Sequence, residues 1–80
     1  MQDEQVFSRI EELSEEEHGL LRRASAGGLN DEEHTRLNEL QVQLDRCWDL
    51  MRQRRARRDA GQDPDEAHTR DAGTVEGYLQ

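Results

Sequence analysis

The stretch that decides the fold is Ala26–Glu33, which reads AGGLNDEE. Paired glycines end a helix readily, because glycine adopts the left-handed backbone conformation that a helix C-terminus favours. Asn30 is a good cap for a following helix, and Glu33, three residues on, completes a capping-box pattern. The sequence therefore predicts one helix before these glycines and a second helix after Asn30.

The segment before this turn has the spacing of an amphipathic helix. From Asp3 to about Ala26 the chain has no proline and one interior glycine, Gly19. Its apolar side chains recur three, four or seven residues apart, at Val6, Ile10, Leu13, Leu20 and Ala24. This periodicity predicts a helix over about residues 3–26 with one apolar face.

The segment after the turn repeats the pattern. Its apolar stripe consists of Leu37, Leu40, Leu44, Cys47 and Met51, with Trp48 alongside. Gly61 and Pro64 end the pattern, since neither continues a helix well. We expect the second helix to cover about residues 31–60.

The two apolar stripes fit each other in antiparallel order. The numbers of facing residues add to 57 in four layers, which pair Val6 with Met51, Ile10 with Cys47, Leu13 with Leu44 and Leu20 with Leu37. The steps of three and four residues are those of a coiled-coil seam. The predicted fold is all-α, an antiparallel two-helix hairpin over residues 1–61.

Residues 62–80 have a different character and form an acidic tail. The segment Asp63–Glu66 has proline where a helix accepts it best, which favours one short helical turn. The end of the chain, Thr74–Gln80, is locally apolar, and its Tyr78 and Leu79 are candidates for docking. The sequence leaves open whether the tail docks on its own hairpin or on another protein.

The composition fits one small domain. The chain has 80 residues, 19 of them acidic and 11 basic, for a net charge of -8. No apolar run is long enough to span a bilayer, and the acidic start does not resemble a signal peptide, so we expect a cytoplasmic protein with no membrane contact. A single cysteine excludes a disulfide framework and a multi-cysteine metal site.

A lone hairpin of this size has little core, which points to association. The simplest arrangement is a homodimer that forms a four-helix bundle, in parallel or antiparallel order. Phe7, Leu21 and Trp48 lie at the edge of the predicted seam. We predict that they form the interaction face together with Tyr78 and Leu79. A heterologous protein partner is the alternative.

A cluster of arginines near the end of the second helix is a candidate anion-binding site. It consists of Arg54, Arg55, Arg57 and Arg58. Such a cluster binds phosphate or nucleic acid in some proteins. No aromatic residue is interleaved for base stacking, however, and neighbouring acids such as Asp3 and Asp65 can neutralise the charge. Nucleic-acid binding is therefore the second hypothesis.

Catalysis and metal binding find less support in the sequence. No catalytic spacing or phosphate-binding glycine loop occurs, so we expect neither enzymatic activity nor a cofactor. Glu15 and His18 repeat the carboxylate-x-x-His spacing of di-iron bundles, but helical geometry directs Glu15 away from the seam. We therefore predict no metal site. Cys47 fits the core, and Glu17, facing Leu40, fits a polar residue that sets the register of the seam.

Three stretches of the chain carry a resemblance to a known family. They are LDRCWDLMRQRRARR at residues 44–58, AGQDPD at residues 60–65 and VEGYLQ at residues 75–80. With these stretches the chain resembles domain of unknown function family 2630, a group of small proteins from GC-rich Gram-positive bacteria. The resemblance covers nearly the whole chain and implies that hairpin, arginine cluster and tail form one recurrent design. It implies no activity.

Overall fold

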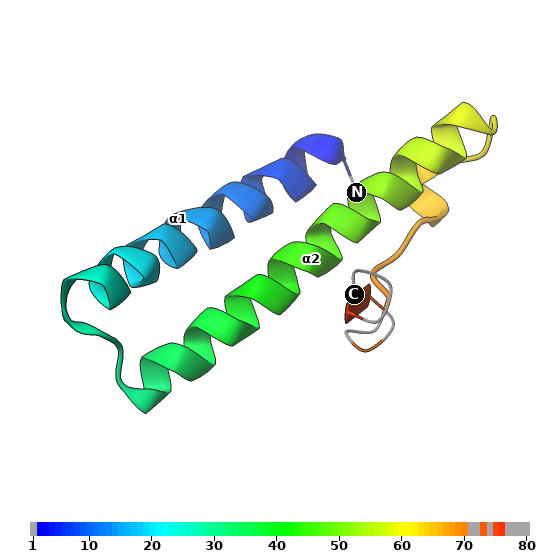
Figure 1. The fold of residues 1–80 in the computed structure, drawn as a ribbon. Helices are drawn as coiled ribbons and strands as arrows, with labels where there is room; N and C mark the ends of the chain where they lie inside the picture. The colour runs from blue at the N-terminus through cyan, green and yellow to red at the C-terminus, as the bar shows by residue number, and fades with distance from the viewer. Residues whose placement is uncertain (1, 71–72, 74, 77–80) are drawn as a thin grey trace.

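The computed structural model describes residues 2–70, 73, 75 and 76. Two long helices, α1 (Asp3–Gly27) and α2 (Asp31–Asp59), lie side by side in antiparallel order and are followed by a short 3-10 turn, η1 (Pro64–Glu66) (Figure 1). The described residues contain no strand. The all-α hairpin predicted from the two apolar stripes is therefore confirmed.

The turn between the helices follows the local chemistry of its residues. Gly28 adopts a φ of 89°, a conformation open to glycine, and its amide donates to the carbonyl of Ala24 over 3.1 Å. Asn30 and Glu33 then bond reciprocally. The Glu33 amide donates to Asn30 Oδ1 over 2.8 Å, and the Asn30 amide donates to Glu33 Oε1 over 3.1 Å. This capping box fixes the start of α2.

The core centres on the seam between the two helices. Its buried apolar residues are Val6, Ile10 and Leu13 of α1 and Leu40, Leu44 and Leu50 of α2. Leu13 is 2% exposed and Leu40 is fully buried, so the seam is tightest near the middle of the hairpin. Leu20, Cys47 and Met51 pack against this cluster from its edges. Leu50 lies outside the predicted seam, and its burial has another cause.

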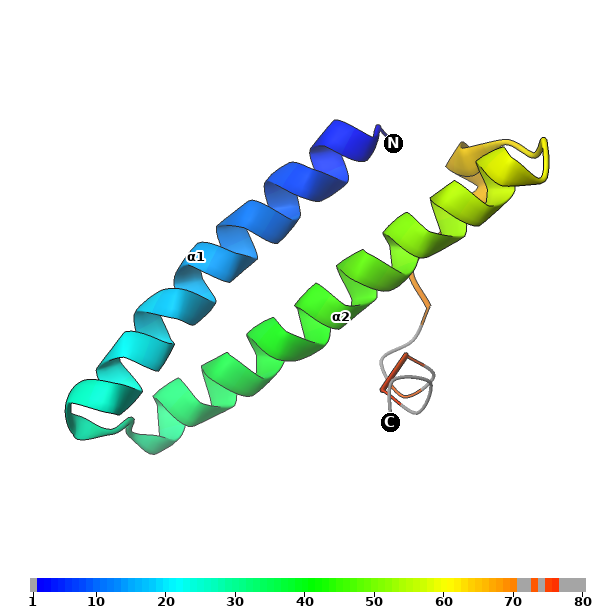
Figure 2. The same cartoon turned by 45° about the horizontal axis from the view of Figure 1, so that its top comes forward.

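That cause is the chain beyond α2, which turns back along the helix. Gly61 has a φ of 73°, and the Gln62 amide donates to the carbonyl of Arg57 over 2.7 Å. In both views α2 lies between α1 and the returning segment (Figures 1 and 2). Ala67 of this segment packs against the core cluster. The segment is thus a third layer on α2.

Polar bonds hold the returning segment in place. Gln53 Nε2 donates to the carbonyl of His68 over 2.9 Å, and Arg46 Nε donates to the carbonyl of Arg70 over 3.0 Å. The described part of the tail therefore docks on its own hairpin. Tyr78 and Leu79, the tail residues predicted to dock, lie outside the described residues.

Candidate interaction site

Arg54 joins all three layers of the molecule at one end of the hairpin. It is only 3% exposed. Its Nε donates to Asp3 Oδ1 of α1 over 2.6 Å, and its Nη1 donates to Asp65 Oδ1 over 3.0 Å and to the carbonyl of Pro64 over 3.3 Å. A buried guanidinium needs such partners, because an unpaired charge in the interior is very costly. Arg54 thus directs its donors to its own chain.

The same contacts shift the titration of the two carboxyl groups. Hydrogen bonds from Arg54, and secondly from Arg58, hold the pKa of Asp3 below its ordinary value. The hydrogen bond from Arg54 likewise lowers the pKa of Asp65, and the bond to Asp3 raises the pKa of Arg54 itself. All three groups therefore stay ionised together at neutral pH.

The other arginines of the predicted anion-binding cluster differ in their surroundings. Arg57 pairs with Glu66 over 3.4 Å, and Arg58 Nη1 donates to Asp3 Oδ2 over 2.6 Å. Arg55 is exposed and has no ion pair with any residue that the structure describes. Among these four residues, Arg55 is therefore the one whose guanidinium forms no ion pair with a carboxylate of a described residue.

Two residues of the predicted interaction face meet beside this arginine. Phe7 is 49% exposed and Trp48 is 45% exposed, and their ring centroids lie 6.4 Å apart in an edge-to-face arrangement. The rings border a groove of about 410 Å³. We call it the aromatic groove, and its lining consists of Asp3, Phe7, Trp48, Met51, Arg52, Arg55 and Arg58.

Leu21, the third residue of the predicted face, lies near the other end of α1. It is 42% exposed and lines a shallow hollow of about 290 Å³ with His18, Arg22 and Ser25. The structure therefore does not bring Leu21 to the aromatic pair. It places an apolar patch near each end of the hairpin.

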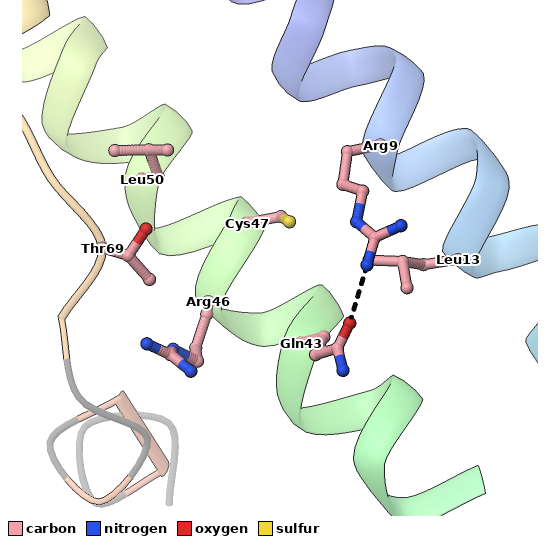
Figure 3. A pocket seen from close by; sticks show the side chains of 7 residues that line it. All are labelled: Arg9, Leu13, Gln43, Arg46, Cys47, Leu50 and Thr69. Carbon is pink, nitrogen blue, oxygen red and sulfur yellow. Dashed lines mark hydrogen bonds between the residues drawn. The ribbon is translucent and has the colours of Figure 1, made fainter. Parts of the chain in front are cut away.

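A second groove lies over α2, with α1 on one side and the returning segment on the other (Figure 3). It measures about 290 Å³ and is lined by Arg9, Leu13, Gln43, Arg46, Cys47, Leu50 and Thr69. Arg9 Nη2 donates to Gln43 Oε1 across it over 3.2 Å. Burial raises the pKa of the Cys47 thiol. A protonated thiol is a poor nucleophile, so this groove offers no evident chemistry.

Asp49 is a structural residue that the sequence patterns missed. It is 3% exposed, and its Oδ2 accepts a hydrogen bond from Gln53 over 2.9 Å. Arg70 of the returning segment approaches it to 3.4 Å and Arg52 to 3.7 Å. Asp49 and Gln53 lie four residues apart, a spacing that favours a side-chain hydrogen bond within a helix. Nothing in the periodicity showed that the tail would cover it.

Glu17 is the polar residue that the sequence places in the seam. Glu17 is half-buried, and Arg36 bonds the neighbouring Glu16, with Nη2 donating to Oε1 over 2.8 Å. This contact lowers the pKa of Glu16.

Among residues 2–70, 73, 75 and 76, no three histidine, cysteine or acidic side chains gather as metal ligands. No described helix is long and apolar enough to cross a membrane.

Comparison with known proteins places the chain in a family. The model of a family described as protein of unknown function, DUF2630, matches residues 2–80. The chain belongs to the DUF2630 family. This confirms the resemblance found in its sequence.

The DUF2630 relatives include mycobacterial proteins of similar length. Uncharacterized protein Rv0898c of Mycobacterium tuberculosis and uncharacterized protein Mb0922c of Mycobacterium bovis are each 44% identical to the chain over 77 residues. The alignment covers 95% of this chain and 88% of each relative. No solved structure matches the chain. The DUF2630 description names no activity.

Proposed function

We propose that this DUF2630 protein is a non-enzymatic interaction module that binds a protein through the exposed apolar residues of its hairpin. The observation that carries the proposal is the exposed pair of Phe7 and Trp48. Large aromatic side chains that stay half exposed together are unusual on a monomer and typical of binding surfaces. Trp and Arg, which lie together in the aromatic groove, are the residues most enriched at the energetic centres of interfaces.

The partner that we propose is a second copy, which gives a dimeric four-helix bundle. The core of one hairpin lies mainly between its two helices, and the returning segment covers α2 on one side. Small helical domains of this kind gain much of their stability by association. Leu21 supports the same conclusion, since it is a third large apolar residue left exposed. Tyr78 and Leu79 remain proposed contributors on the sequence argument alone.

Trp48 is the only tryptophan of the chain and therefore reports on the proposed surface directly. Burial of its ring in a dimer should shift its fluorescence emission to shorter wavelength as the protein concentration rises. Light scattering on the same samples should show the mass doubling. Phe7→Ala should weaken both changes, whereas a mass of one chain at every concentration would contradict the proposed dimer.

Anion binding through the arginines is the second candidate, and the exposure of Arg55 favours it. The ion pairs of Arg54, Arg57 and Arg58 count against it, because these side chains already hold carboxylates. A salt-sensitive gel shift of RNA or DNA that is lost in Arg55→Gln would support this candidate. No shift at low salt would remove it.

A further inference from the structure

The side of α1 that carries Phe7 and Leu21 also carries an ordered set of charges. Fourteen residues separate Phe7 from Leu21, which is two heptads and about 21 Å along the helix. Both side chains therefore lie near one face of α1, and Ser14 lies midway between them. Glu4 and Glu11 belong to the half around Phe7, whereas His18 and Arg22 belong to the half around Leu21. We call this surface the α1 face.

The charged residues of the α1 face are available to a partner. Glu4, Glu11, His18 and Arg22 are all exposed. None of these four side chains forms a hydrogen bond or an ion pair with another residue that the structure describes. By contrast, Arg9 and Glu12 lie toward the opposite side of α1 and pair with each other over 3.4 Å. These four side chains are thus unmatched, with the two acids toward Phe7 and the two nitrogen-bearing side chains toward Leu21.

The order of these residues is self-complementary about Ser14. We consider a second α1 helix laid antiparallel beside the first, with the two Ser14 residues level. Position 7 of one copy then lies level with position 21 of the other, and position 4 lies within about 3 Å of the level of position 22. Glu11 comes to the level of His18 in the same way. Phe7 therefore meets Leu21, and two acidic side chains meet nitrogen-bearing ones, Glu4 with Arg22 and Glu11 with His18. A symmetric interface between identical subunits requires this kind of match.

The opposite orientation lacks the match in charge. In a parallel pair, each residue of the α1 face meets its own copy, so that Glu4 faces Glu4 and Arg22 faces Arg22. Like charges in register are destabilising along paired helices. The apolar residues would tolerate either orientation, and charge therefore decides between them.

We propose that a second copy of this chain docks antiparallel along the α1 face, with Phe7 of one copy against Leu21 of the other. The hollow beside Leu21, lined by His18, Arg22 and Ser25, receives the Phe7 ring. Glu4 of each copy pairs with Arg22 of the other, so the pair occurs twice in the dimer. This inference rests on the proposed function, because it specifies the partner and the orientation of the same binding face.

A charge exchange tests the pairing. Glu4→Arg alone and Arg22→Glu alone should each weaken the dimer about tenfold in sedimentation equilibrium, because each change breaks two modest ion pairs. The double variant that carries both changes should regain most of the lost affinity. Glu12→Arg reverses a charge on the opposite side of α1 and should leave the dimer unchanged. Circular dichroism of each variant checks that the helices remain.

A distance measurement tests the orientation independently. Ala26 is exposed near the end of α1, twelve residues from Ser14. A spin label on Ala26→Cys, placed in a Cys47→Ala background, should show a separation near 36 Å or somewhat more in the antiparallel dimer, from about 1.5 Å per residue. Parallel helices would bring the two labels together.

The outcomes separate this inference from the proposed function. A dimer with a short distance between labels, or with no recovery in the double variant, overturns the antiparallel arrangement and leaves dimerisation standing. A single-chain mass at every concentration overturns both. A dimer with the long distance and a recovered double variant supports both.

Discussion

Asp3, the first residue of α1, accepts a hydrogen bond from Arg54 over 2.6 Å, although 51 residues separate them in the chain. The same guanidinium reaches Asp65 beyond the end of α2. One buried side chain therefore fastens the start of α1, the last turns of α2 and the 3-10 turn. Ion pairs therefore hold the helices together at the end of the hairpin that lacks the connecting turn.

Removal of Arg54 should loosen this end. Arg54→Gln leaves the two carboxylates without their shared partner, and we expect a lower melting temperature in circular dichroism. Arg55→Gln is the matched control, since Arg55 lies one position on and is exposed. Equal melting temperatures for the two variants would show that Arg54 has no structural role.

Stability should fall in acid because of the same contacts. The pKa values of Asp3 and Asp65 are lowered in the folded state. Their contribution to stability is therefore complete above the unfolded pKa of about 3.9 and is lost as the pH falls through the lower folded-state pKa. Urea unfolding at a series of acidic pH values should show this loss. Asp3→Asn should flatten the acid limb, and an unchanged pH profile in this variant would contradict the assignment.

Glu76 should respond to pH in the opposite direction. Its Oε1 is buried without a hydrogen-bond donor among the described residues, and its neighbour Asp45 is also acidic. The contact with Asp45, followed by burial, raises the pKa of Glu76. Docking of this segment is then favoured below the unfolded pKa of about 4.3 and weakens as the pH rises through the higher folded-state pKa.

The methyl groups of Val75, which is 1% exposed, give a local reading of this change. Their NMR shifts should move toward unfolded values as the pH rises through the folded-state pKa of Glu76. In Glu76→Gln the amide donates to Asp45 at every pH, so the movement should disappear. Val75 shifts that follow the same pH course in both proteins would refute the carboxyl pair.

The centre of the seam should be the most sensitive apolar position. Leu13→Ala removes a side chain that is 2% exposed and should lower the free energy of unfolding by about 2 to 5 kcal/mol. Chemical unfolding measures the loss. A change below about 1 kcal/mol would mean that the seam is not packed as described.

The hairpin was predictable because local and periodic signals agreed. Gly28, Asn30 and Glu33 specify the turn, and apolar residues at steps of three and four specify which faces meet. The rule that facing positions add to 57 also puts position 54 opposite position 3, and the structure joins Arg54 to Asp3. Each of these features depends on residues near in sequence or on a single seam.

The burial of Leu50 and Asp49 was not predictable in this way. Both lie outside the predicted seam, and the returning segment adds to their surroundings: Arg70 approaches Asp49 to 3.4 Å, and Thr69 borders the same groove as Leu50. That segment is held largely by hydrogen bonds from α2 side chains to its backbone carbonyls. Such bonds leave no periodic pattern in its sequence. The DUF2630 match covers residues 2–80 and thus includes both hairpin and tail.

The central claim is that the exposed apolar side chains of the hairpin serve to bind a second copy. Sedimentation equilibrium of the unmodified protein and of Leu21→Glu, from low to high micromolar concentration, tests it most directly. Leu21 takes no part in the buried core, so this change should leave the fold of the single chain intact. We predict a reversible dimer for the unmodified protein and a monomer for Leu21→Glu. The same mass for both proteins at every concentration would contradict the account.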